Sequence, residues 1–355
     1  MPGNIVYFLG AGASKSFGYP LTGEIIPMIM ERLIKHDLFQ ISNSRKTKSE
    51  IKQEKNLLSY LYLLYPGLNG KKKFDDINSI PNITEILSLV DHFCFYNIPP
   101  HPKIADDTLT YFRNLLNRAV GELLLEIDNL PYSNEEKALL SKFFNPIRNE
   151  KRSSNVTLIT SNYDLIVDRE FKNQLRQNRV DYGISYRNVT SSELVYRNPD
   201  PLFSYYKLHG SLNWAKCDLC GQYYINPEGS IIHQCFKEAL LDENTCICSK
   251  NLRLKSVLVT PSLVRDIRDA NLLQIWKCAL EKIRTADQLI FIGYSLPPED
   301  LALKSIIIRG VNGRSKERPL EVIVVQQGDA AKNNYINLFG KNIQYHSRGL
   351  QEYLR

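Results

Sequence analysis

Residues Ile5–Ser14 read IVYFLGAGAS, a short apolar run that ends in a glycine-rich turn. The run has the length of a buried parallel strand. Gly10 and Gly12 allow a tight turn that a phosphate can approach closely, and a helix after the turn would direct its N-terminal amides toward that phosphate. The stretch therefore predicts the start of a nucleotide-binding sheet. Because the third glycine of the usual dinucleotide pattern is absent, the alternative is a turn that only joins a strand to a helix.

Apolar runs bounded by polar turns return in the second half of the chain. They predict strands at residues 155–160, 202–208, 256–260, 288–293 and 320–326, and helical patterns at 271–284 and 298–309 lie between them. Strands that alternate with helices are typical of a doubly wound parallel sheet. The predicted class is α/β, with a Rossmann-like sheet.

A long block with a different pattern separates the first strand from the second. From residue 22 to residue 150, apolar residues recur at spacings of three and four, which indicates helices. We interpret residues 22–150 as a mainly helical insertion in a single domain that spans residues 1–355.

Composition limits the classes of protein to consider. The chain has 355 residues and is 43% hydrophobic, which is enough for a substantial core. It has no apolar run of membrane-spanning length and no signal-peptide pattern at its N-terminus, so a cytoplasmic location is expected. The net charge of +7 comes from mostly scattered residues, and direct nucleic-acid binding is not indicated.

Polar residues follow three of the predicted strands, at the edge where parallel sheets bind their ligands. Asn162 and Asp164 follow the strand at 155–160, and His209 follows the strand at 202–208. Gly293 and Ser295 follow the strand at 288–293 and could hold a phosphate or a ribose. The alternatives are structural, since Asp164 could cap the next helix and a lone histidine is often a surface or core residue.

Four of the seven cysteines form two close pairs, Cys217-x-x-Cys220 and Cys246-x-Cys248. Close pairs favour a metal over disulfides, and four thiolates suit a structural zinc ion. We therefore predict a zinc-binding lobe at residues 212–254. Two alternatives stay open: His233 or Cys235 replaces one ligand, or the four cysteines are reduced and unconnected.

Taken in order, these motifs resemble the sirtuin superfamily over nearly the whole chain, from residue 5 to about residue 326. The resemblance implies NAD as the ligand and cleavage of its nicotinamide–ribose bond as the chemistry. It implies that Asn162 lies near the nicotinamide ribose, that Asp164 recognises the carboxamide, and that His209 is the general base. The remaining NAD-binding residues that it implies are Gly10, Ala11, Gly12, Ala13, Ser14, Gly293 and Ser295.

The chain departs from the protein deacetylases of this family at two places. Those enzymes carry Asp-Phe-Arg after the Gly-Ile-Pro of a flexible loop, whereas residues 18–23 here read GYPLTG. They also carry Phe-Gly-Glu where residues 259–262 read VTPS. Both differences argue against acetyl-lysine transfer. The chain is more similar to bacterial sirtuin-like domains that hydrolyse NAD in defence against phage.

The first hypothesis is therefore an NAD glycohydrolase, with structural zinc. The other hypotheses are a protein deacylase or ADP-ribosyltransferase, and a non-catalytic module that binds NAD or ADP-ribose. Because an enzyme that depletes NAD must be restrained, the resemblance also implies a homo-oligomer or a complex with a partner such as a HerA-type ATPase.

Overall fold

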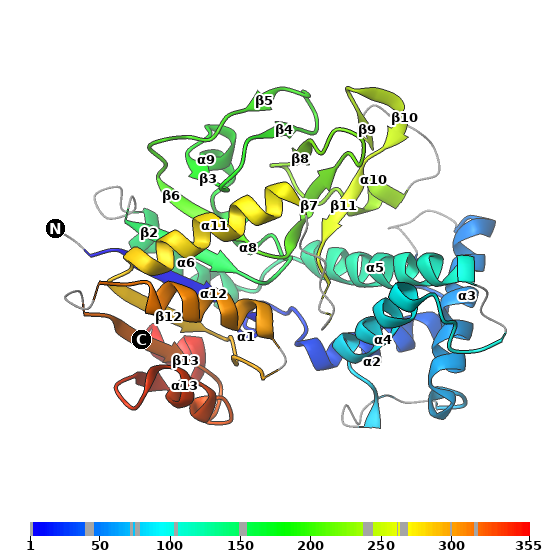
Figure 1. Ribbon diagram of the computed structural model, residues 1–355, viewed down its shortest axis with the longest axis horizontal. Helices are drawn as coiled ribbons and strands as arrows, with labels where there is room; N and C mark the ends of the chain where they lie inside the picture. The colour runs from blue at the N-terminus through cyan, green and yellow to red at the C-terminus, as the bar shows by residue number, and fades with distance from the viewer. Residues whose placement is uncertain are drawn as a thin grey trace. The chain divides into compact units, whose positions relative to one another are not determined.

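The computed structural model describes residues 3–39, 46–71, 74, 79–102, 106–148, 155–236, 244–260, 262, 269–298, 300–315 and 319–355. The chain divides into two compact units (Figure 1). Unit 1 comprises Met1–Tyr19, Leu130–Leu258 and Ile267–Arg355, and unit 2 comprises Pro20–Asn129 and Val259–Asp266. The helical segment 22–150 thus extends over nearly all of unit 2 and also includes α6 (Asn134–Arg148), which belongs to unit 1.

Unit 1 is built on a seven-stranded sheet in which every neighbouring pair of strands is parallel. Across the sheet the order is β14 (Gln344–His346), β13 (Glu321–Val325), β12 (Gln288–Ile292), β1 (Ile5–Leu9), β2 (Val156–Thr160), β6 (Phe203–Lys207) and β3 (Val180–Asp181). The predicted α/β class with a parallel sheet is confirmed. The edge strands β3 and β14 have only two and three residues, which is too short for an apolar run to reveal them.

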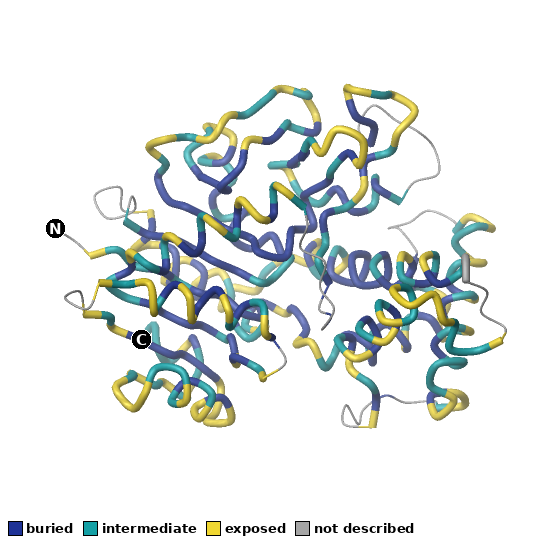
Figure 2. The backbone as a smooth tube through the Cα atoms, viewed as in Figure 1, coloured by how far each residue is buried: buried dark blue, intermediate teal, exposed yellow. Residues whose placement is uncertain are grey.

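The central strands are buried on both faces, as the dark blue tube of the sheet shows (Figure 2). On one face, Phe291 of β12 packs against Tyr335 and Phe339 of α13. On the other face, Tyr7 of β1 packs edge-on against Phe143 of α6. Strands covered by helices on both faces read as continuous apolar runs, and this explains why the sequence shows them clearly.

In the chain, each of the longer helices of unit 1 comes before a strand of the parallel sheet. Alongside α6 they are α11 (Ala270–Thr285), α12 (Leu301–Asn312) and α13 (Lys332–Phe339). The shorter helices are α1 (Ala11–Lys15), α8 (Ile166–Glu170), α9 (Lys172–Arg176), α10 (Ile232–Phe236) and α14 (Gly349–Tyr353). The long helices α11 and α12 pack against each other (Figure 1), and a Cβ atom on Gly310 of α12 would lie 2.4 Å from Ile283 of α11.

A second sheet of five strands has the order β11 (Lys255–Leu258), β7 (Gly210–Lys216), β8 (Tyr223–Ile225), β4 (Tyr186–Asn188) and β5 (Leu194–Val195). Strands β9 (Thr245–Cys246) and β10 (Ser249–Arg253) form a separate antiparallel hairpin, which lies between β8 and β11 in the sequence. The strand predicted at 256–260 therefore does not join the parallel sheet, because β11 pairs antiparallel with β7. A short apolar run does not by itself show which strands it pairs with or in which direction.

The helices described in unit 2 are α2 (Ile25–Lys35), α3 (Lys48–Leu64), α4 (Ile83–Tyr96) and α5 (Asp106–Asp128), with the short turns η1 (Thr22–Glu24) and η2 (Pro66–Leu68). Among the described residues of unit 2, Arg118 is a buried cation, and its guanidinium lies 4.4 Å from the centre of the Phe39 ring. Arg118 also pairs with Glu50 at 3.3 Å and with Glu122 at 3.4 Å. Pairing offsets much of the cost of burying this charge.

Across the described residues of both units, no helix combines the length and the apolar character that crossing a membrane requires.

Candidate functional site

The glycines of the first turn allow two strand ends to meet. The Gly10 amide donates to the Ile292 carbonyl at 3.0 Å, and the Gly12 amide donates to the Gly293 carbonyl at 2.8 Å. A Cβ atom would lie 2.6 Å from the Tyr294 Cα if built on Gly10, and 2.8 Å from the Gly293 Cα if built on Gly12. The turn after β1 thus packs directly on the turn after β12. This contact gives both glycines a structural role, and their predicted contact with a phosphate stays a prediction.

Among the three glycines of this contact, Gly293 leaves the least space for a side chain. Its φ is +61°, and a Cβ atom there would lie 2.0 Å from the Ala13 nitrogen. The predicted ligand residue Ser295 follows in the same loop with an exposed side chain, and its carbonyl accepts from Asn334 at 3.0 Å.

We expect Gly293→Ala to destabilise unit 1 strongly. The left-handed conformation alone costs roughly 1–2 kcal/mol for an L-residue, and the overlap with the backbone of α1 adds to it. A thermal melt followed by circular dichroism should show a midpoint at least about 4 °C lower. Gly229→Ala is the matched control, because a Cβ atom at Gly229 meets nothing within 4 Å. Equal melting temperatures for both variants would contradict this role of Gly293.

Three predicted site residues form one hydrogen-bonded chain across the ends of β1 and β2. The Asn162 side-chain amide donates to the Gly10 carbonyl and to the Ser14 hydroxyl, both at 2.8 Å. The Ser14 hydroxyl in turn donates to the Asp164 carboxylate at 2.6 Å. Asp164 also accepts from the Ile166 amide at 3.2 Å, so it holds the first turn of α8 as well. The structural interpretation of Asp164 is thus confirmed, and its predicted contact with a ligand stays a prediction.

A pocket in unit 1 opens onto this chain of hydrogen bonds. Its polar groups are those of Ser14, Thr160, Asn162 and Asp164. Its remaining walls are mostly apolar, from Leu9, Ala13, Phe17, Phe143, Phe144, Ile166, Val167, Tyr205, Ile292 and Leu350. Apolar walls with a few convergent polar groups are typical of a small-molecule site.

The surroundings of Asp164 change its acidity. Burial raises the pKa of this carboxyl, and the Lys207 ammonium and the Ser14 hydroxyl offset the rise only in part. A carboxyl whose pKa is raised by burial and that lines a pocket is a candidate functional group.

His209 lies at the end of β6 and is 4% exposed. Its Nδ1 lies 3.2 Å from the Ser161 carbonyl oxygen. Because a carbonyl oxygen only accepts, Nδ1 carries the proton in the neutral ring, and the lone pair is on Nε2. Nε2 is therefore the nitrogen that can take up a proton.

The four paired cysteines come together, as the sequence predicts. The sulfur atoms of Cys217, Cys220, Cys246 and Cys248 all lie within 4.8 Å of one another. Two of these distances are 3.6 Å, from Cys217 to Cys248 and from Cys220 to Cys246. Four thiolates at about 2.3 Å from a tetrahedral zinc ion would be about 3.8 Å apart. The donor set therefore fits zinc closely.

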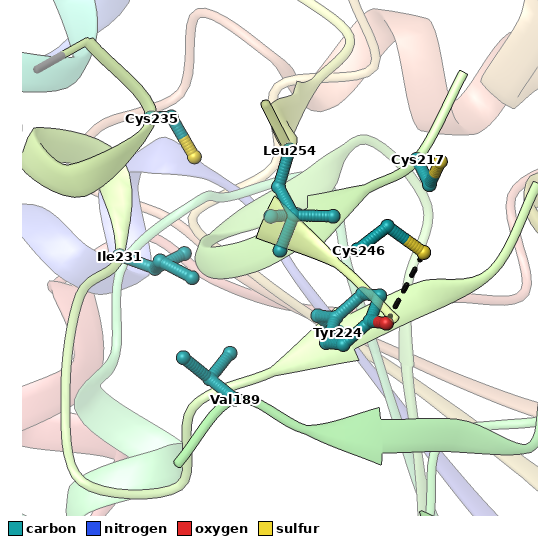
Figure 3. Close-up of a cluster of buried hydrophobic side chains, with 8 residues drawn as sticks. Val189, Cys217, Tyr224, Ile231, Cys235, Cys246 and Leu254 are labelled. Carbon is teal, nitrogen blue, oxygen red and sulfur yellow. Dashed lines mark hydrogen bonds between the residues drawn. The ribbon is translucent and has the colours of Figure 1, made fainter. Parts of the chain in front are cut away.

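The alternative ligands are wrong. Among the described residues, the metal-binding group contains neither His233 nor Cys235. Cys235 packs in a buried apolar cluster with Val189, Ile231 and Leu254, which also contains Cys217 and Cys246, but its sulfur is not in the group of four (Figure 3). Burial raises the pKa of its thiol to about 12, so a thiolate ligand is disfavoured at this position.

Sequence reasoning assigned no role to three buried polar residues next to the site. Lys207 of β6 donates to Asp168 of α8 at 2.9 Å, and Tyr182 donates to the same carboxylate at 2.5 Å. The available signal was a lysine inside an otherwise apolar strand, since lysine is almost never fully buried unless it is paired.

No family model and no curated protein matches this chain. It is similar to solved structures of Sir2 proteins. A mutant Sir2 homologue in complex with ADP-ribose is 14% identical, with a TM-score of 0.43, and the match covers 99% of this chain and 88% of that one. A structure described as Sir2 with a p53 peptide and NAD+ is 12% identical, with a TM-score of 0.39, and the match covers 99% and 90%. The class that the structure itself defines is a doubly wound parallel α/β protein with a four-cysteine lobe.

Proposed function

We propose that this protein hydrolyses NAD to nicotinamide and ADP-ribose. The observation that carries the proposal is the pocket at the ends of β1 and β2, where Ser14, Asn162 and Asp164 are hydrogen-bonded to one another among apolar walls. Its apolar walls, together with an amide and a carboxylate, match the chemistry of a mostly apolar ring that carries one amide. The nicotinamide of NAD is such a ring, and the resemblance in sequence favours the same ligand.

In this proposal, each polar group has a role that follows from its chemistry. The bond between the ribose C1′ and the nicotinamide nitrogen breaks, and its electron pair goes to that nitrogen. The ribose gains positive charge, and a water oxygen forms the new bond to C1′. Asn162 orients the ribose or the water, and Asp164 recognises the carboxamide.

His209 receives the proton that the attacking water loses. Its Nδ1 is directed to the Ser161 carbonyl, so Nε2 accepts the proton and later passes it to solvent. Histidine is the side chain that most often serves as a general base. The balance is one NAD and one water consumed, and one nicotinamide, one ADP-ribose and one proton released.

Incubating the purified protein with NAD and no peptide tests the proposal. We expect nicotinamide and ADP-ribose in equal amounts. A deacylase would release almost no nicotinamide under these conditions, and a protein ADP-ribosyltransferase would leave ADP-ribose attached to protein. If the protein binds NAD and no assembly state of it forms product, the binding module is the better interpretation.

We infer from the resemblance alone that the reaction serves a bacterial anti-phage system, in the cytoplasm. A homo-oligomer or a complex with a HerA-type ATPase would restrain it. Cellular NAD measured during phage infection, with and without an Asn162→Ala variant, tests the defence role. Native mass spectrometry tests the assembly.

We also propose that Cys217, Cys220, Cys246 and Cys248 hold structural zinc. The ion would join the turn after β7 to the β9–β10 hairpin, and it would stabilise a lobe that has little core of its own. It takes no part in the reaction.

A further inference from the structure

Lys207 is a buried charge to which the proposed reaction gives no role. It is the last residue of β6, its exposed fraction is 0%, and it precedes His209 by two residues. Its Nζ donates to the Asp168 carboxylate at 2.9 Å and to the main-chain carbonyl of Asp164 at 2.8 Å. Replacing a buried ion pair by apolar residues is often neutral or stabilising. Fold stability alone therefore does not explain why the lysine is there.

Hydrogen bonds to the main-chain carbonyl groups of residues 160–164 fix the segment that carries Asn162 and Asp164. Four of them accept hydrogen bonds from the β6–β7 region. On the same segment, the Asn162 side chain bonds to Gly10 and Ser14, and the Asp164 side chain bonds to Ser14. The donors are the Leu208 amide to Thr160 at 2.9 Å, His209 Nδ1 to Ser161 at 3.2 Å, the Leu212 amide to Tyr163 at 3.1 Å and Lys207 Nζ to Asp164 at 2.8 Å. Lys207 supplies the only one of these four bonds that a charged group donates.

Asp168 keeps the lysine in place. Besides Lys207, its carboxylate accepts from the Tyr182 hydroxyl at 2.5 Å and from the Asn213 side-chain amide at 3.1 Å. All four side chains are buried. The donors come from β6, from β7 and from the residue after β3, so Asp168 is fixed from several elements at once.

We propose that Lys207 is a positioning residue for the reaction. Its ammonium, fixed by Asp168, holds the Asp164 carbonyl and thereby sets the direction of the Asn162 and Asp164 side chains relative to His209. Lys207 is not among the residues that line the pocket, so it acts through the Asp164 segment and not directly on the substrate. This inference rests on the proposed NAD hydrolysis.

A pair of variants separates positioning from stability. Lys207→Met leaves Asp168 buried without its cation, and we expect it to lower the melting temperature as well as kcat. The double variant Lys207→Met with Asp168→Asn removes that unpaired charge but does not restore a donor to the Asp164 carbonyl. We expect it to melt near the wild-type temperature and still to have a kcat about 10- to 100-fold lower, with a smaller change in KM for NAD.

Arg197→Met is the matched control. Arg197 pairs with Asp181, a carboxylate that is 4% exposed, through bonds of 2.9 and 2.8 Å, and Asp181 lies on β3 of the same sheet. This control leaves a carboxylate as buried as Asp168 without its cation, although the Arg197 side chain itself is 42% exposed, and it removes no bond to the 160–164 segment. We expect it to cost stability and to leave kcat within about twofold of wild type.

Hydrogen–deuterium exchange supplies a readout that does not need activity. We expect faster exchange over residues 160–165 in the double variant and not in Arg197→Met. A double variant with wild-type kcat, or with exchange equal to that of Arg197→Met, overturns the proposal. If the double variant does not fold, the single variant Lys207→Met, which also lacks a donor to the Asp164 carbonyl, takes its place, and its kcat and exchange are judged by the same criteria. If the wild-type protein does not cleave NAD, the proposed function fails, and the exchange comparison still decides whether Lys207 positions the segment.

Discussion

His209→Asn should abolish NAD cleavage and leave the fold intact. The asparagine amide can still donate to the Ser161 carbonyl, which His209 Nδ1 contacts at 3.2 Å, but it cannot accept a proton as the imidazole does. General bases contribute about 100- to 10,000-fold to rate, so we expect kcat to fall by at least about 100-fold. Initial rates of nicotinamide release, measured beside a thermal melt, check both parts.

Two further variants test whether the loss of activity comes from the missing base at position 209. His209→Ala removes the base and the bond to Ser161 together, so it should be inactive and less stable than His209→Asn. His346→Ala, which removes an exposed histidine at the end of β14, should keep wild-type activity. Substantial turnover by His209→Asn would exclude His209 as the base, while the pocket could still bind NAD.

Loss of one cysteine ligand should release zinc and unfold the lobe. We expect one zinc ion per wild-type chain by elemental analysis, and none after Cys248→Ser. Cys248 is exposed, so the substitution leaves no cavity in the core, and its effect reports on the metal. Structural zinc contributes about 10–16 kcal/mol in zinc-finger peptides, so even a part of that value should lower the melting temperature by more than about 10 °C.

Cys94→Ser controls for the loss of a thiol, since Cys94 lies on α4 in unit 2 and outside the four-cysteine group. It should keep both zinc and stability. Treatment of the wild-type protein with a strong chelator should reproduce the effect of Cys248→Ser. A natively purified protein without zinc, or a Cys248→Ser variant that retains it, would show that the thiols have another role.

The two predictions depend on different kinds of evidence. The cysteine pairs are close in sequence within each pair, and the structure adds the sulfur distances of 3.6 Å between pairs. The role of His209 depends on where a strand ends and on which nitrogen faces Ser161. The strand end was predicted from the sequence, whereas only the three-dimensional structure shows which nitrogen of His209 faces Ser161.

The sequence by itself determined the α/β class, the five longer strands of the parallel sheet and the placement of Asn162, Asp164 and His209 at strand ends. Buried parallel strands are apolar runs, and their carboxyl ends share one edge of the sheet, so local pattern is sufficient for these inferences. It also indicated the four cysteine ligands, because their short spacings are local.

The tertiary structure alone decided which distant segments meet. It placed residues 255–258 antiparallel to β7, assigned Cys235 to an apolar cluster, and showed that Gly10 and Gly12 pack on the turn after β12. It also showed that the Lys207 ammonium donates a hydrogen bond to the Asp164 carbonyl. These facts are distances between residues far apart along the chain, and no local spacing or periodicity encodes such distances.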